Sequence, residues 1–276
     1  MNKRNLIIGL GVLLVIVVLV LIPKGKKEEI VSDIDSISTP APKAAANTLY
    51  QQAVALNNGG DLLKAKELYK RIVTEYPDFE NIASTQKELE SLNMRIIFSN
   101  TPTEKAVLHD IQAGDTLGKI AKKYGTTVDL IKISNNLQND TIRVGKKLRV
   151  WTGQFNIFVD KSQNILMLKE GDDVVKVYRV STGSENSTPV GQYKITSKLV
   201  DPVWFNKGVV LPPESPQNVL GTRWLGFDLP GYGIHGTIEP ETIGQQVTAG
   251  CVRMRNQDVE ELYSIIPLGV DVVIVN

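Results

Sequence analysis

Cys251 and His235 are the residues whose types and spacing most directly suggest chemistry. Cys251 is the only cysteine in the 276 residues, and it follows His235 by sixteen positions. A lone cysteine cannot form an internal disulfide, and a thiol can act as a nucleophile when an oriented imidazole takes its proton. Glycines beside both residues let backbone and substrate approach closely. The pair therefore predicts nucleophilic thiol chemistry with His235 as the base.

Composition excludes several other kinds of chemistry. Two histidines and one cysteine cannot furnish a zinc site built on nitrogen and sulfur ligands, and we expect neither a metal nor another cofactor. The formal net charge of +1 gives no strong attraction to nucleic acid, so we expect none as a partner. His109, the second histidine, is predicted to be a strand residue and not a catalyst.

An apolar run near the N-terminus predicts a membrane anchor. Residues 6–22 are Leu, Ile and Val interrupted only by two glycines, and basic residues flank both ends. About 20 apolar residues span a bilayer, and no small-residue cleavage site follows the run. Residues 1–23 are therefore predicted to be an uncleaved transmembrane helix, the alternative being a cleaved signal peptide. Residues 24–46 mix Ser, Thr, Pro and charges without a sustained period, which predicts a flexible linker.

Helical periodicity follows in residues 47–98. Small residues at Ala53 and Ala65 would let two antiparallel helices pack closely, and a further helix is expected at about 79–94. The spacing of small and aromatic residues resembles one tetratricopeptide repeat. Because stacked neighbours supply the core of such repeats, a single one favours a helical spacer. The alternative is a surface that binds a protein partner.

Residues 106–150 predict a β-α-α-β module. A short alternating strand precedes a Gly-Asp-Thr-Leu turn, two short helices follow, and the Ile-x-x-Gly-x-x-Leu ending forms a return strand. With its Ile-Ala-x-x-Tyr helix, the whole stretch resembles a LysM domain. The resemblance implies binding of N-acetylglucosamine-containing glycans such as peptidoglycan. It places the glycan groove at Gly114, Asp115, Thr116, Ile133, Asn135, Asn136 and Leu137, although Asp115 and Thr116 can equally cap a helix.

From Phe155 the hydrophobic period changes from 3.6 to two, which predicts a β-rich domain over residues 154–276. Strands are expected at 155–159, 165–168, 174–180, 192–197 and 270–275. One helix is expected to begin at an Asn256 cap and to stop at Pro267. The predicted fold class is thus α+β and multidomain: a transmembrane helix, a helical hairpin, the β-α-α-β module and the β-rich domain.

Motifs in this last domain resemble the L,D-transpeptidase catalytic domain of the YkuD type. They are Thr-Pro-Val-Gly at 188–191, Gly-Tyr-Gly-Ile-His-Gly-Thr at 231–237, and Gly-Cys-Val-Arg-Met-Arg-Asn at 250–256. The resemblance implies cleavage of the bond between the third residue of a peptidoglycan stem, an L-centre, and D-alanine. A cysteine thioester would then pass the acyl group to an amine of a neighbouring stem, giving a 3→3 cross-link.

The resemblance also implies roles for single residues. Cys251 would be the nucleophile, His235 the base and then the acid, and the Gly236 carbonyl would orient the imidazole. The amides of Gly250 and Cys251 would form an oxyanion hole. The residues expected to contact substrate are Arg253, Thr248 and Tyr232. Arg253 could equally brace the loop. Tyr232, like Trp204 and Trp224, could line a cleft, but core packing is the favoured interpretation for all three.

One position departs from the family pattern. The usual run is Ser/Thr-His-Gly-Cys, whereas Ala249 stands where the histidine would be. Two alternatives to a transpeptidase therefore stay open: a weakly active or inactive peptidoglycan-binding scaffold, and an L,D-carboxypeptidase that resolves the same acyl-enzyme with water. For all three, the expected location is the cell membrane by a single pass, with the domains after Ile22 outside the cytoplasm.

Overall fold

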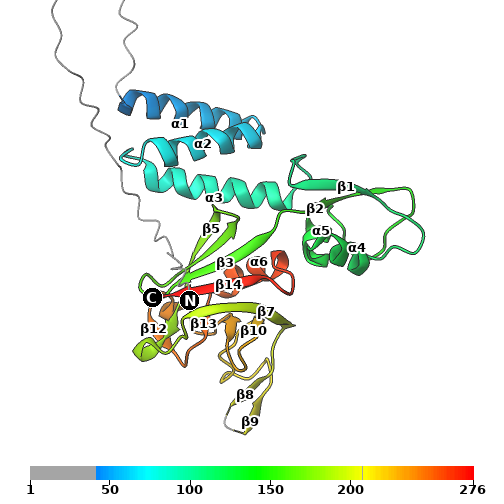
Figure 1. Cartoon of the computed structure of the whole chain (residues 1–276), viewed down its shortest axis with the longest axis vertical. Coiled ribbons are helices and arrows are strands. Elements are labelled where there is room, and N and C mark those ends of the chain that lie inside the picture. The colour runs from blue at the N-terminus through cyan, green and yellow to red at the C-terminus, as the bar shows by residue number, and fades with distance from the viewer. Residues whose placement is uncertain (1–41, 207) are drawn as a thin grey trace, which may run out of the picture. The chain divides into compact units, whose positions relative to one another are not determined.

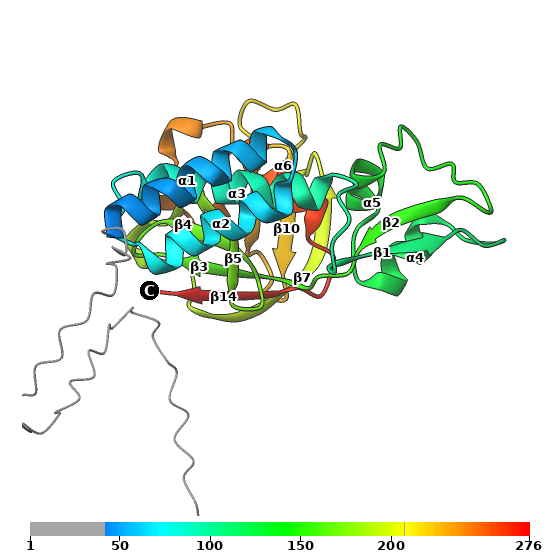
Figure 2. The same cartoon turned by 90° about the horizontal axis from the view of Figure 1, so that it is seen from above.

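A computed structural model describes residues 42–206 and 208–276. The predicted membrane anchor and most of the predicted linker lie outside these residues. Within the described residues, no helix combines the length and apolarity needed to cross a membrane. The described residues form one compact unit, whose elements are shown from two directions in Figures 1 and 2.

Three helices come first: α1 (Pro42–Asn58), α2 (Leu62–Glu75) and α3 (Ile82–Phe98). Helix α1 begins four residues before the predicted end of the linker, and α3 ends four residues after the predicted end of the third helix. The Asp61 side chain caps α2 by accepting the N–H of Lys64. As predicted, Ala53 and Ala65 are fully buried in the core that these helices share.

Helix α3 also covers the last domain. Its residues Met94, Ile96 and Ile97 belong to the main core of that domain, and Figure 1 shows the helix next to β5 (Asp173–Arg179) and running across its direction. The buried Asn93 side chain donates a 2.9 Å hydrogen bond to the Val175 carbonyl of that strand. The helical segment is therefore part of the folded body through α3, and does not hang from it as a separate spacer.

The predicted β-α-α-β module is present as β1 (Ala106–Asp110), α4 (Leu117–Tyr124), α5 (Val128–Ser134) and β2 (Lys147–Trp151). Strands β1 and β2 pair antiparallel. The Thr116 and Thr127 hydroxyls cap the two helices, and Gly125 ends α4 in the left-handed conformation at φ 67°. Local capping chemistry in the sequence thus determines where both helices begin and where α4 ends.

An eight-stranded sheet forms the last domain, in the order β13-β11-β10-β7-β14-β3-β4-β5. Its strands are β3 (Phe155–Asp160), β4 (Ile165–Glu170), β5, β7 (Gly191–Val200), β10 (Arg223–Phe227), β11 (Gly233–His235), β13 (Val252–Arg253) and β14 (Asp271–Val275). The five predicted strands are confirmed as β3, β4, β5, β7 and β14. The short strands β10, β11 and β13 were not predicted, and they carry the chemistry.

Smaller elements complete the domain. Strands β6 (Thr182–Gly183) and β12 (Gln246–Thr248) pair with each other, as do β8 (Trp204–Asn206) and β9 (Val209–Leu211). Helix α6 (Asn256–Ile265) packs on β10 and β11, and its residues Val259, Leu262 and Ile265 are fully buried. Apolar side chains at this helical spacing fix α6 against the strands of the site.

Arg149 joins the β-α-α-β module to the helices. Its side chain, only 4% exposed, donates to the carbonyls of Ile96, Ile97 and Thr101 at distances of 3.0 to 3.1 Å. The last carbonyls of a helix have no partner within the helix, so a charged donor at α3's end satisfies them. The guanidinium therefore fixes β2 to the end of α3.

We expect Arg149→Ala to lower the free energy of unfolding by about 3 kcal/mol, because it leaves buried carbonyls without donors. Arg143→Ala, at an exposed position of the same module, should change it by less than about 0.5 kcal/mol. Urea unfolding followed by circular dichroism measures both. Equal midpoints for the two variants would contradict this role of Arg149.

Candidate active site

Strands β11 and β13 bring the predicted histidine and cysteine together. They pair in parallel, with Ile234 opposite Val252 and His235 opposite Arg253. The Met254 N–H also donates a 2.8 Å hydrogen bond to the His235 carbonyl. Cys251 directly precedes β13, so it enters the site beside the strand that ends in His235. His235 and Cys251, sixteen residues apart in sequence, thus lie on and directly before two neighbouring strands of the sheet.

The His235 ring is oriented by its backbone. Its Nδ1 lies 2.6 Å from the Gly236 carbonyl oxygen. A carbonyl only accepts, so Nδ1 carries the proton and Nε2 is left as the basic nitrogen. The ring stacks on Trp224, with centroids 6.1 Å apart and an interplanar angle of 18°. Burial lowers the pKa of His235 to about 4, so the imidazole is neutral at pH 7.

The Cys251 thiol is held nearby in its protonated form. Its Sγ donates to the Gly231 carbonyl at 3.5 Å. Burial raises the pKa of Cys251, while a hydrogen bond from Gly233 and the charge of Arg253 act in the opposite direction. With both pKa values displaced in this way, the resting pair is a neutral thiol and a neutral imidazole. The arrangement suits proton transfer to His235 during attack.

Gly250 has a backbone conformation that favours glycine. Its φ is +128°, and a Cβ there would lie 2.7 Å from Cε1 of Tyr232. The Gly250 N–H donates to the Thr248 hydroxyl at 3.2 Å. This bond engages one of the two amides predicted for the oxyanion hole. The Cys251 N–H has no acceptor among the described residues, and it remains the better candidate donor.

Thr248 has a different role from the predicted substrate contact. Its side chain is buried, and its hydroxyl donates a 2.6 Å hydrogen bond to the Cys251 carbonyl. It therefore closes the turn that holds the nucleophile. Ala249, between Thr248 and Gly250, is exposed, so a larger side chain there would extend into solvent.

Arg253 braces a neighbouring loop. The side chain is 8% exposed, and Nη1 donates to Glu239 Oε2 at 2.7 Å and to the Thr242 hydroxyl at 3.0 Å. Of the two roles considered from sequence, these contacts favour bracing over substrate binding. Tyr232 likewise packs over Gly250 and against the main core.

Asn256 is a positioning residue that sequence reasoning assigned wrongly. It was expected to cap α6, but Arg255 occupies the cap position and Asn256 begins the helix. Its Oδ1 accepts the N–H of Thr237 at 2.9 Å and the N–H of Thr222 at 3.3 Å. Because Thr237 follows the carbonyl that orients His235, this amide fixes the backbone of the imidazole. The signal that could have identified this role from sequence is the position of Asn256 at the end of the motif at 250–256, which also contains Cys251.

A cavity of about 310 Å³ opens at the thiol. It is lined by Leu199, Pro202, Val203, Trp204, Phe205, Leu220, Trp224, Gly231 and Cys251. The residues from β8 cover it from one side, and its lining is mostly apolar. Trp204 and Trp224, for which core packing was the favoured interpretation, both face this cavity. Such a wall can exclude water from a reacting thioester.

Two of the residues predicted for the glycan groove have structural hydrogen bonds at its first side. Asp115 accepts hydrogen bonds from the Gln112 amide and from His109 Nε2, each at 2.9 Å, and Thr116 caps α4. His109 is structural, as expected, since its Nδ1 also contacts the Tyr124 hydroxyl at 3.0 Å.

At the other side of the predicted groove, the Asn135 side chain is bonded to the backbone of Arg149 in both directions at 2.7 Å. Ile133, Asn136 and Leu137 instead line a cavity of about 540 Å³ that faces the last domain. Gly114 has φ +86° in an open turn and lines none of the described cavities. Among the described residues there is no group of three His, Cys, Asp or Glu side chains placed to hold a metal ion.

Comparison with known proteins agrees with this arrangement. The model of the L,D-transpeptidase catalytic domain matches residues 154–275, and the LysM domain model matches residues 109–151. YqjB of Bacillus subtilis, named as an L,D-transpeptidase, is 40% identical over 124 residues, which are 43% of this chain and 69% of YqjB. The chain belongs to the YkuD-type L,D-transpeptidase family.

Two further relatives are matched over different lengths of the chain. The L,D-transpeptidase YkuD of Bacillus licheniformis is 31% identical over 171 residues, covering 59% of this chain and 95% of that protein. The cell wall-binding protein YocH of Bacillus subtilis is 45% identical over 56 residues, which are 20% of each chain. Both the LysM domain and the catalytic domain of this chain are matched by family models.

The neutral resting state predicts a particular pH profile for the thiol. Because only the thiolate is nucleophilic and burial raises the pKa of Cys251, alkylation by iodoacetamide should accelerate with pH up to and beyond about pH 9. Mass spectrometry follows the labelling, and Cys251→Ala should take up none, since the chain has no other cysteine. A rate that is constant from about pH 5 to 8 would instead indicate a preformed thiolate–imidazolium pair.

Proposed function

We propose that the chain is a peptidoglycan L,D-transpeptidase that uses Cys251 as its nucleophile. The observation that carries the proposal is that Cys251 directly precedes β13, which pairs with the strand that ends in His235, and that the Nδ1 of this imidazole is bonded to the Gly236 carbonyl. That bond leaves Nε2 as a base, and a backbone carbonyl takes the orienting role that an aspartate has in a Ser-His-Asp triad. Membership of the family and the apolar cavity at Cys251 support the same reaction class.

The first half-reaction forms an acyl-enzyme. His235 Nε2 takes the thiol proton as Sγ attacks the carbonyl of the third stem residue, and the Cys251 amide stabilises the developing oxyanion. When the tetrahedral intermediate collapses, the bond to D-alanine breaks and its amine takes the proton from His235. The third residue is left as a thioester on Cys251.

The second half-reaction transfers the acyl group. An amine of a neighbouring stem attacks the thioester carbonyl and gives its proton to His235. Collapse forms the new amide and returns the proton to the leaving Cys251 sulfur. Water in place of the amine would give a carboxypeptidase, and the same residues would serve.

The remaining segments support action at the cell wall. The LysM domain would hold the enzyme on glycan strands, and residues 1–23 would anchor it as a single-pass membrane helix with the other domains outside the cytoplasm. Stem peptides and glycan strands are the proposed partners. The helical segment is proposed to brace the catalytic sheet through α3.

A carbapenem, an acylating β-lactam, should add one molecule to the wild-type chain at Cys251. Peptide mass spectrometry locates the adduct, and Cys251→Ala is the control. Purified sacculi treated with each protein should contain 3→3 cross-linked muropeptides only with the wild type. An adduct that persists in Cys251→Ala would refute the nucleophile, and shortened stems without cross-links would identify a carboxypeptidase.

Ala249 provides a test of the scaffold alternative. Because Ala249 is exposed and no proton transfer is assigned to it, Ala249→His should change the carbapenem acylation rate by less than about fivefold, whereas His235→Ala should lower it by about 100-fold or more. Stopped-flow fluorescence or timed mass spectrometry measures both rates. A wild type that acylates as slowly as His235→Ala, and is rescued by Ala249→His, would show that the natural chain is a lapsed enzyme.

A further inference from the structure

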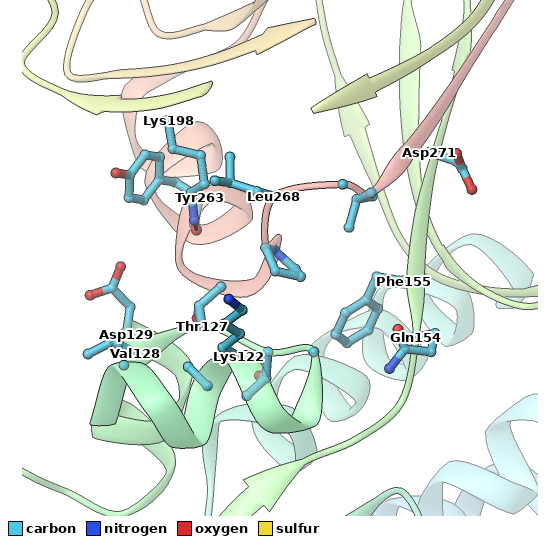
Figure 3. Close-up of a pocket in the computed structure, with 17 residues that line it drawn as sticks. Lys122, Thr127, Val128, Asp129, Gln154, Phe155, Lys198, Tyr263, Leu268 and Asp271 are labelled. Carbon is cyan, nitrogen blue, oxygen red and sulfur yellow. Dashed lines mark hydrogen bonds between the residues drawn. The ribbon is translucent and has the colours of Figure 1, made fainter. Parts of the chain in front are cut away.

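A groove lies between the LysM domain and the catalytic domain. It consists of two cavities, of about 830 and 540 Å³, that share Asp129 and Tyr263 as lining residues. Figure 3 shows the larger one, with Lys122, Thr127 and Val128 of the LysM domain on one wall and Lys198, Tyr263 and Leu268 of the catalytic domain on the other. Ligand sites commonly form at such domain boundaries.

The walls of this interdomain groove are held in place by buried contacts. The Thr127 hydroxyl donates to the Ser264 carbonyl, and Thr127 and Ser264 are 7% and 8% exposed. Leu130 of α5 is 1% exposed and belongs to the core of the catalytic domain. Lys198, in the opposite wall, donates to the carbonyls of Tyr263 and Ile266 at 2.6 and 2.7 Å. The groove is therefore part of the fold, with both walls fixed.

The lining of the smaller cavity suits a neutral ligand that is rich in hydroxyl and amide groups. Two acidic side chains, Asp129 and Glu260, are balanced by two basic ones, Lys132 and Arg223. Ile133, which is 47% exposed, and the ring of Tyr263 add apolar surface between them. Balanced charges disfavour a polyanion, whereas mixed donors, acceptors and an amphipathic ring match an N-acetylated sugar chain.

The smaller cavity and the cavity at Cys251 are lined by successive residues of the same two strands. Val200 and Arg223 line the former, Leu199 and Trp224 line the latter, and these residues pair across β7 and β10 as Val200–Arg223 and Leu199–Trp224. Successive residues of a strand point to opposite faces, so the two cavities lie on either side of one short ladder. A three-residue stem peptide reaches about 10 Å when extended, which suits passage around such an edge.

We propose that the interdomain groove binds the glycan strand of the donor substrate, and that the catalytic domain supplies half of this glycan site. Val200, Arg223, Glu260 and Tyr263 would contact the sugars together with Ile133 and Asn136 of the LysM domain. The strand's stem peptide would then turn around the ends of β7 and β10 to Cys251. The proposal rests on the proposed function, because it takes the substrate to be a glycan-linked stem.

The test is binding of the β-1,4-linked hexamer of N-acetylglucosamine to the full-length chain, measured by isothermal titration calorimetry. Val200→Trp fills the groove from the catalytic side at a position that is 53% exposed, and Ile133→Ala removes contact from the LysM side. Both should weaken binding of the hexamer at least fivefold. The matched controls are Val190→Trp and Val144→Ala, at positions that are 55% and 66% exposed and outside the groove, and both should bind like the wild type.

Hexamer affinity in Val200→Trp within fivefold of that in Val190→Trp would overturn the proposal, as would a wild type that does not bind the hexamer. Carbapenem labelling of the wild type is measured in the same samples and reports on Cys251 alone. Labelling without hexamer binding refutes the groove and leaves the proposed reaction standing. Hexamer binding that depends on Val200, without labelling, supports the groove and refutes the reaction.

Discussion

The hydrogen bond from His235 Nδ1 to the Gly236 carbonyl is the interaction on which the site depends. At 2.6 Å it determines which nitrogen carries the proton, and it does so without a second charged residue. A carboxylate in this place would raise the pKa of the imidazole, whereas a neutral carbonyl does not offset the effect of burial, and the pKa falls to about 4. The ring is thus an available base at neutral pH, ready to accept a proton from a thiol that burial also keeps neutral.

Further hydrogen bonds hold the backbone around His235 and Cys251 in place, and they explain why several polar residues of the site face inward. Asn256 fixes the amide after Gly236, Thr248 closes the turn before Cys251, and Arg253 ties the β13 strand to the loop of Glu239. Each of these residues forms its hydrogen bonds with backbone groups or with side chains of loops. A reaction that moves one proton between two neutral groups needs their positions fixed more than it needs further charges nearby.

Sequence alone predicted those features whose causes are local. Threonine caps, a left-handed glycine and the period of apolar residues determine α4, α5 and strands β3, β4, β5, β7 and β14, and these elements were all expected. Strands β11 and β13 have only three and two residues, too few for a period to be recognised. The five residues of β10 do not alternate between buried and exposed positions, and all three strands exist because neighbouring strands supply partners. Asn256 was assigned the wrong role for a related reason: its hydrogen-bond partners, the amides of Thr222 and Thr237, lie on loops whose approach is set by tertiary packing.

The way the LysM domain is attached changes how it would serve the enzyme. A binding module on a flexible linker raises the concentration of substrate around a site but leaves its orientation free. Here Leu130 lies in the catalytic core, Arg149 closes the end of α3, and Thr127 bonds to α6. A module held at three points cannot swing, so any glycan it binds meets the catalytic domain in one orientation. The substrate would then lose most of its rotational freedom when the glycan binds. The stem peptide would therefore lose less entropy when it reaches Cys251.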